Sequence, residues 1–255
     1  MLDLKTKVLD SKGPVLFSVG QAGFIVKSSN GQLLAIDLFL SNCVERIEGH
    51  KGFKRLLPQL LDPSDLIFDI IVCTHPHLDH FDIDAIPEMM NHGVPQLYCS
   101  VDCEKLIKQM QLEYYESQIN YVKPGDHFKD GDFDITFVNC DHGTGVPDAV
   151  GVILQVDGKT IYEVGDSCLR LDRVGEIKSV SEIVDVLISP INGMYGNMNS
   201  EDTVKLAEAI SPKITIPCHY GMFASHGGDL KSFYDLTSER RIRTLILQQG
   251  EGYKL

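Results

Sequence analysis

Four residues with metal-ligating side chains lie within six positions of this sequence, at His75, His77, Asp79 and His80. They directly follow the apolar run 68–73, which predicts a buried strand, so we expect them on the loop that leaves it. Imidazole and carboxylate ligands suit Zn, Mn or Fe, and a site without cysteine leaves positions open for water. The alternative is an exposed histidine-rich turn. Nine histidines in 255 residues would rarely place three beside an acid by chance.

Three further candidate ligands, each just past a predicted strand, are His142, Asp166 and His219. Either histidine alone would more often be a hydrogen-bonded core residue, and the aspartate alone would more often be a turn former. Open sheets gather their functional loops at strand ends, so we expect these three residues near the first cluster. Together, the seven side chains predict one metal site.

The elements that must position these residues are mostly short strands. Runs rich in β-branched and apolar residues predict strands at 15–18, 23–27, 33–37, 69–73, 96–99, 135–139, 149–156, 159–163, 185–189, 214–217 and 243–247. Helices are expected near 51–61, 82–92, 102–113, 201–210 and 228–237. Hairpins first and strand–helix alternation later predict an α/β fold with helices packed outside the sheets. With no linker or repeat evident, one domain over residues 1–255 is the simplest organisation.

Composition narrows the class of protein. The chain is 43% apolar and 23% charged, as is usual for soluble globular proteins. A formal net charge of −13 argues against binding nucleic acid, whose phosphates select basic surfaces. No apolar run is long enough for a membrane span, and the N-terminus lacks the pattern of a signal peptide. Seven cysteines without a CxxC pair favour reduced thiols and a cytoplasmic location.

The histidine-rich segment, followed in order by His142, Asp166 and His219, resembles the metal-binding pattern of the metallo-β-lactamase superfamily. The resemblance extends from about residue 15 to 250. It implies a four-layer αββα sandwich of two mixed β-sheets flanked by helices, with a metal centre at one edge of the sheets. It also implies a hydrolase with one or two divalent metal ions per chain, Mn²⁺ or Zn²⁺ ahead of Fe.

The resemblance further implies a division of the ligands between two ions. The first ion would be held by His75, His77 and His142. The second would be held by Asp79, His80 and His219, with Asp166 as a bridge between the two ions.

A narrower resemblance rests on softer motifs. They are GQAGF at 20–24, IDLFLS at 36–41, NGMYGNMN at 192–199 and IPCHYGMF at 216–223. These segments look like the L-ascorbate-6-phosphate lactonase branch, which opens a sugar-acid lactone with a divalent metal. The chain is shorter than full-length lactonases of that type, which leaves the exact substrate open.

The implied chemistry is attack by a metal-bound hydroxide on a small lactone, since the metal lowers the pKa of its bound water to about 7. The leaving alkoxide needs a proton, for which Asp79 and Tyr220 are the candidate donors by position. Asp37 is either an acid that orients a metal-bound histidine or a turn residue.

A glycine-containing loop provides candidate substrate contacts in Asn192, Tyr195 and Asn197, whereas Asn199 is better explained as a helix cap. His226 is either a substrate-side group or part of a surface turn. We expect a small, anionic substrate and no nucleic-acid or membrane partner, and the oligomeric state stays open.

Two rival functions remain. A metal-dependent phosphodiesterase or phospholipase would use the same site, because a metal-bound hydroxide can also attack phosphorus. A protein that binds metal or metabolites without catalysis would keep the fold but not need every ligand.

Overall fold

Two β-sheets facing each other form the centre of the computed structural model, which describes residues 3–143 and 145–255. The seven-stranded sheet runs in the order β13 (Gly252–Lys254), β1 (Val15–Gly20), β2 (Gly23–Lys27), β3 (Leu33–Ile36), β4 (Ile70–Cys73), β5 (Gln96–Ser100), β6 (Ile119–Val122). The six-stranded sheet runs in the order β12 (Ile214–Cys218), β11 (Val186–Pro190), β10 (Lys159–Glu163), β9 (Val150–Val156), β8 (Phe133–Asn139), β7 (His127–Asp130). Both sheets contain parallel and antiparallel pairs.

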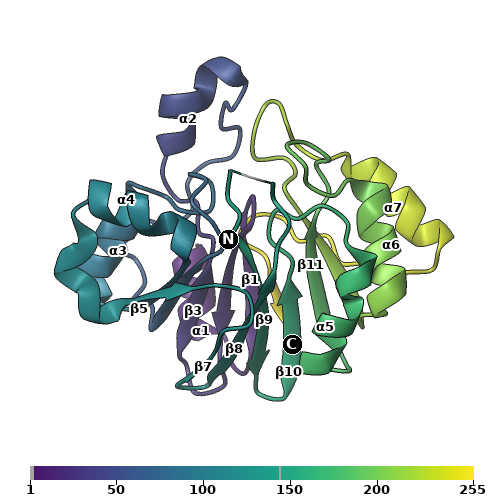
Figure 1. Cartoon of the computed structure of the whole chain (residues 1–255), viewed down its shortest axis with the longest axis horizontal. Coiled ribbons are helices and arrows are strands. Elements are labelled where there is room, and N and C mark those ends of the chain that lie inside the picture. Colours follow the sequence, from purple (N-terminus) through teal and green to yellow (C-terminus); the bar gives the residue numbers. More distant parts are fainter. Residues whose placement is uncertain (1–2, 144) are drawn as a thin grey trace.

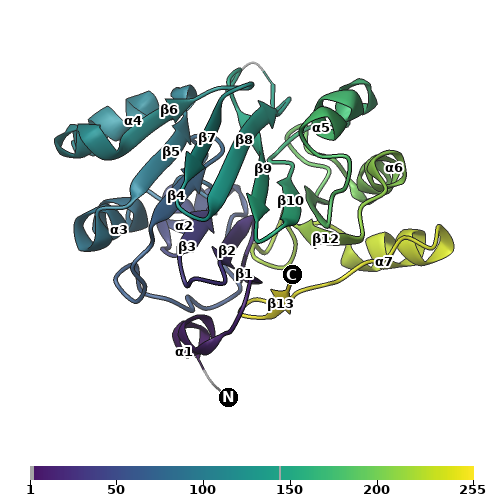
Figure 2. The ribbon, with the colours of Figure 1, turned by 90° about the horizontal axis from the view of Figure 1, so that it is seen from below.

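Helices cover the outer face of each sheet, as Figure 2 shows. Beside the seven-stranded sheet lie α1 (Leu4–Asp10), α3 (Ala85–Gly93) and α4 (Glu104–Gln109). Beside the six-stranded sheet lie α5 (Val174–Val180), α6 (Ser200–Ile210) and α7 (Leu230–Glu239). Short 3-10 turns are η1 (Gly49–Lys51), η2 (Val101–Cys103), η3 (Leu112–Gln118) and η4 (Leu171–Arg173). The predicted αββα sandwich is therefore confirmed.

The core between the sheets is made of inward-facing side chains from both. Leu34, Ile36 and Val72 come from one sheet, and Val152 and Ile188 come from the other; all five are fully buried. Two further apolar layers fill the space between each sheet and its helices. Removing this area from water is the main favourable contribution to folding, and it keeps the strand ends fixed relative to one another.

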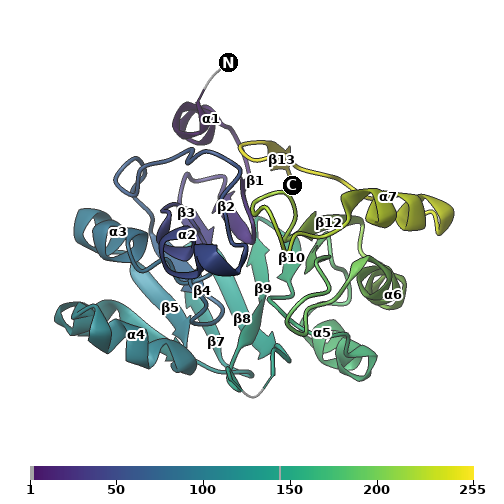
Figure 3. The same ribbon diagram turned by 90° about the horizontal axis from the view of Figure 1, so that it is seen from above.

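The strand directions bring several loops to one edge of the sandwich. β9 is antiparallel to both β8 and β10, and β10, β11 and β12 are mutually parallel. The carboxyl ends of β8, β10 and β12 therefore lie at the same edge. Helix α2 (Cys43–Glu48) and the loops that follow it stand above this edge, at the top of Figure 1 and in the foreground of Figure 3.

Two predicted elements are wrong. The expected helix at 51–61 is irregular chain, because Gly52 has a left-handed φ of 100° and the following residues pair with a distant segment. There the Leu56 N–H donates to the Met222 carbonyl at 2.8 Å. The expected strand at 243–247 is reduced to a single bridge between Thr244 and Thr215.

Seven free cysteines are present, six buried and Cys168 half-buried, in agreement with the expected reduced thiols. In the part of the chain that the structure describes, no helix has the length and apolar character needed to cross a membrane.

Candidate metal centre

The histidine-rich segment forms a tight loop directly after β4. Two backbone N–H groups, of His80 and Phe81, donate to the carbonyl of His77 at 2.9 and 2.7 Å. This turn folds His75, His77 and His80 toward one point, while the buried strand fixes the position at which the loop starts. The short spacing of the motif is thus a requirement of the turn as well as of the ligands.

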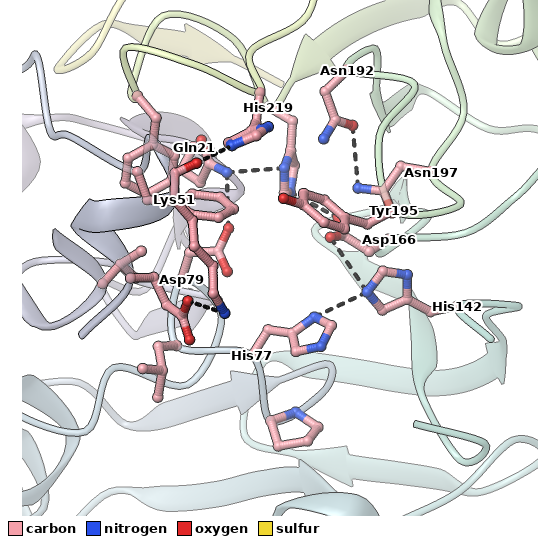
Figure 4. Close-up of a pocket in the computed structure, with 17 residues that line it drawn as sticks. Gln21, Lys51, His77, Asp79, His142, Asp166, Asn192, Tyr195, Asn197 and His219 are labelled. Atoms are coloured by element: carbon pink, nitrogen blue, oxygen red, sulfur yellow. Dashed lines mark hydrogen bonds and ion pairs between the residues drawn. The ribbon is translucent and has the colours of Figure 1, made fainter. Parts of the chain in front are cut away.

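Three imidazole nitrogens meet at the first position. His77 Nδ1 lies 2.9 Å from His75 Nε2 and 3.0 Å from His142 Nε2, and a dashed line joins the His77 and His142 rings in Figure 4. Two nitrogens bound to one Zn²⁺ at its usual bond length stand roughly 3.3 Å apart in a tetrahedral site. The three rings are therefore spaced almost as ligands of a single ion.

Asp166 lies between this group and a second one. Its Oδ2 is 4.0 Å from His75 Nε2 and 3.7 Å from His142 Nε2, on the side of the first group. The same oxygen is 3.5 Å from His80 Nε2, and Oδ1 is 2.8 Å from His219 Nε2. With Asp79 Oδ2 at 3.9 Å from His80 Nε2, the second group consists of Asp79, His80 and His219. All seven predicted ligands are brought together.

Three of the ligand atoms in this centre have no hydrogen-bond partner among the described residues. His80 Nε2, His219 Nε2 and Asp166 Oδ1 are buried and make no hydrogen bond, although the last two are only 2.8 Å apart. Buried polar atoms without partners are costly, and native proteins retain them where an ion or ligand binds. The mixed histidine and carboxylate donor set also suits divalent Zn or Mn. The residues therefore fit metal ions.

Asp37, at the end of β3, supports one ligand of each group. Its Oδ2 accepts from His80 Nδ1 at 2.7 Å and from the Thr74 hydroxyl at 2.6 Å, and its Oδ1 accepts from the Thr74 N–H. Thr74 Oγ1 in turn lies 3.0 Å from His75 Nδ1. These contacts fix the outer nitrogen of each ring and leave Nε2 free for a metal. Asp37 is the orienting acid, not a simple turn residue.

Gln21 also belongs to the metal centre. It lies in the GQAGF motif at 20–24, but the sequence analysis assigned it no role. Its Nε2 lies 2.8 Å from Asp79 Oδ2 and 2.9 Å from His219 Nδ1, and its carbonyl accepts from the His219 N–H at 3.0 Å (Figure 4). Gln21 and His219 both have left-handed backbone, with φ of 54° and 58°. One amide thus joins two ligands that come from opposite sheets.

The electrostatics differ between the two groups. Burial lowers the pKa of His75 well below its usual value, and it lowers the pKa of His142 to about 4. Burial acts on His80 in the same direction, but the nearby carboxylates of Asp166 and Asp37 outweigh it and raise the His80 pKa well above normal. The lowered pKa values of His75, His77 and His142 favour neutral rings at pH 7, whereas the raised pKa of His80 favours its doubly protonated, cationic form.

A cavity of about 330 Å³ opens above the ligands, within the range of small-molecule sites. Its walls come from three loops and include Lys51, Phe53, Asn192, Tyr195 and His226. The predicted contacts Asn192, Tyr195, Asn197 and His226 do line this cavity, and Asn199 caps α6 in a capping box with Asp202.

Tyr220 is not brought to the cavity. Its hydroxyl donates to the Leu247 carbonyl at 2.6 Å, and its side chain lines a separate, much smaller hollow. His50, His92 and His127 are exposed, as expected for surface histidines.

The sandwich and the edge-located histidine–aspartate cluster are those of the metallo-β-lactamase fold. Residues 39–220 match the family model of the beta-lactamase superfamily domain, so the chain belongs to that family.

A UPF0173 metal-dependent hydrolase of Thermodesulfovibrio yellowstonii is 27% identical over 256 residues, covering 92% of this chain and 90% of the relative. The metallo hydrolase Igni18 of Ignicoccus hospitalis aligns with a TM-score of 0.71 at 24% identity, covering 94% of this chain and 97% of that one. An isothiocyanate hydrolase from Delia radicum gut bacteria aligns with a TM-score of 0.72 at 22% identity, covering 94% and 98%. The sequence relative supports a metal-dependent hydrolase, and the two solved structures share the fold.

Replacing Gln21 with alanine should weaken one metal position and not the other. Among the described residues, the Gln21 side chain hydrogen-bonds only to Asp79 and His219. Gln21→Ala should therefore lower the affinity for the second ion by about 10-fold, as loss of an orienting partner does, and leave the first unchanged. Equilibrium dialysis with elemental mass spectrometry measures both. The exposed Gln109 on α4 provides the matched control, Gln109→Ala. Equal loss at both positions would show that Gln21 only stabilises the fold.

Binding of the second metal ion should release a proton from His80, whereas binding of the first should release none from its histidine ligands. Since the His75 and His142 pKa values are lowered, the first ion binds neutral rings and takes no proton from them at pH 6, where a metal-bound water with a pKa of about 7 also keeps most of its protons. His80, with a raised pKa, must lose its proton, so affinity for the second ion should fall as pH drops below the His80 pKa. Titration calorimetry in buffers of different ionisation enthalpy counts the protons. Release of a full proton with the first ion at pH 6 would contradict this assignment.

Proposed function

We propose that this chain is a metal-dependent hydrolase that opens a small lactone. The observation that carries the proposal is the convergence of seven ligand side chains on the floor of a cavity that suits a small molecule. A phosphorylated sugar-acid lactone such as L-ascorbate 6-phosphate is the substrate that the sequence motifs suggest. The similarity to metal-dependent hydrolases supports the reaction class.

When bound, the metal ions would make a coordinated water more acidic and polarise the substrate carbonyl. The protein residues provide the geometry for this chemistry. The low pKa values of His75 and His142 keep both rings available as ligands at neutral pH. Asp166 sets the distance between the two groups, and Asp37 fixes the ring orientation of His80. These contacts already hold the side chains in place, which favours preorganised catalysis.

Asp79 is the proposed carrier of the proton that the leaving alkoxide requires. It is half-buried and lines the cavity, so a substrate oxygen can approach its carboxylate. Its Oδ2 accepts a hydrogen bond from the Gln21 side-chain amide, and this bond holds the carboxylate in a fixed orientation. The hydroxyl of Tyr220, the other candidate, donates to the Leu247 carbonyl, and Tyr220 does not line the cavity.

The proposed function is tested with metal-reconstituted protein and a panel of substrates. The panel holds γ-butyrolactone, L-ascorbate 6-phosphate, bis(p-nitrophenyl) phosphate and phenyl isothiocyanate, the last because a structural neighbour is an isothiocyanate hydrolase. We expect lactone hydrolysis that His77→Ala lowers by at least about 100-fold, since the ring is a direct ligand. The exposed His127 on β7 gives the control variant, His127→Ala, which should keep full activity.

Other results would favour a rival. Turnover of the phosphodiester with none of the lactones would indicate a phosphodiesterase. Stoichiometric metal binding without turnover of any compound would favour a protein that binds metal or metabolites. Lactone activity that survives His77→Ala would contradict the assigned site.

A further inference from the structure

The wall of the cavity that faces the metal ligands is aromatic and joins three separate loops. Phe53 lies 4.5 Å from the His226 ring and 6.0 Å from the Tyr195 ring, measured between centroids, and Tyr195 lies 5.5 Å from His226. All three residues line the cavity. We call these three residues the aromatic wall.

The aromatic wall is not needed to hold two of these loops together. The chain at 54–56 already pairs with the chain at 222–224 through backbone hydrogen bonds of 2.8 Å and a bridge between Arg55 and Phe223. Tyr195 comes from the third loop and stays 59% exposed despite its ring contacts. Its ring therefore keeps surface available for contact with a ligand.

The loop that carries Tyr195 holds the ring over the cavity at a conformational cost. Tyr195 has a φ of 54°, a region that bulky side chains avoid, between Gly193 and Gly196, which also have positive φ. The Met198 N–H donates to the Ser167 carbonyl at 2.9 Å, which ties this loop to the one carrying Asp166. Strain of this kind persists where it serves a function, and Figure 4 shows Tyr195 beside the metal ligands.

Two amides lie beside the aromatic wall. Asn197 Nδ2 donates to Asn192 Oδ1 at 3.1 Å (Figure 4). Asn197 is 7% exposed, and its Oδ1 is buried and accepts no hydrogen bond from the described residues. A buried acceptor of this kind calls for a donor, and a hydroxyl group of a ligand would be one.

The cavity offers no unpaired lysine or arginine among the residues described. Lys51 is the only such side chain that lines it, and its Nζ is already 2.5 Å from Glu48 Oε2. Glu48 also lines the cavity, so a phosphate placed there would meet a carboxylate as well as the ammonium group. The Lys51–Glu48 pair has no net charge. This part of the cavity therefore favours a ligand group without a charge, such as a hydroxyl, over a phosphate.

We infer that the substrate is an uncharged, hydroxylated ring lactone, which lies with one face on the aromatic wall and donates a hydroxyl hydrogen bond to the amide pair Asn192–Asn197. The C–H face of such a ring suits an aromatic surface, whose negative π-face attracts the positive edges of C–H groups. This inference rests on the proposed lactone hydrolysis and specifies its substrate. It differs from the anionic substrate that the sequence led us to expect.

The test compares three lactones with metal-loaded enzyme: L-gulono-1,4-lactone, its 6-phosphate and γ-butyrolactone. We expect kcat/KM for the neutral hydroxylated lactone to exceed that for each of the other two by about 10-fold or more. Tyr195→Ala should raise KM for L-gulono-1,4-lactone by about 10-fold with a smaller effect on γ-butyrolactone. Tyr195→Phe, which keeps the ring, should restore the preference. Tyr234 on α7, 58% exposed and outside the cavity, provides the control Tyr234→Ala, which should match the unmodified chain.

Preference for the 6-phosphate, or an equal loss with both neutral lactones in Tyr195→Ala, would overturn the inference. If no lactone is hydrolysed, the proposed function fails, and the ligand class is then judged by binding alone. The probe is 1,4-anhydro-D-glucitol, which has the hydroxylated ring but no scissile carbonyl, compared with its 6-phosphate by ligand-observed NMR. Binding of the neutral ring that Tyr195→Ala weakens about 10-fold would support the inference. Absence of binding, or tighter binding of the phosphate, would contradict it.

Discussion

The buried carboxylate of Asp37 is the contact on which the geometry of the metal centre depends. It is 0% exposed, and it accepts hydrogen bonds from the Thr74 backbone, the Thr74 hydroxyl and His80 Nδ1. Through Thr74 it also reaches His75, so one carboxylate orients a ligand of each metal position. An unpaired buried charge would be strongly destabilising. Removing either Thr74 or His80 should therefore destabilise the protein by leaving the Asp37 carboxylate without one of its hydrogen-bond partners.

Strain in the backbone is concentrated around the same site. Ten non-glycine residues of the described chain have left-handed φ, and five of them surround the cavity or the ligands: Gln21, Asp37, Tyr195, His219 and His226. Each such residue costs about 1–3 kcal/mol, which the packed sheets and helices must offset. The apolar core between the sheets provides a frame rigid enough to hold these conformations. The fold thus places its stability in the core and its strain at the edge where ligands converge.

The ligands could be predicted from the sequence because each lies just after a strand with a clear apolar pattern. The β4 run and the short spacing of His75, His77 and His80 define a loop whatever the rest of the chain does. The Asp157–Gly158 turn between β9 and β10 is equally local, because an Asp-Gly pair favours the positive φ that both residues adopt.

What sequence reasoning missed depends on contacts between distant segments. Gln21 acts on residues 58 and 198 positions away, and no local pattern signals such contacts. The aromatic wall likewise combines Phe53, Tyr195 and His226. These residues are far apart in the sequence and meet only in the folded chain. The expected helix at 51–61 failed for the same reason, since that segment exchanges its own hydrogen bonds for pairing with residues 222–224. Local propensity is a weak guide where tertiary pairing satisfies the backbone.

The central claim is that seven side chains form a centre for two metal ions with Asp166 between them. The most direct measurement is a crystal structure of the metal-reconstituted protein with anomalous diffraction recorded at the metal absorption edge. The account predicts two peaks, one beside His75, His77 and His142 and one beside Asp79, His80 and His219, each within bonding distance of Asp166. A single peak outside these groups, or ions that leave Asp166 unbound, would contradict it.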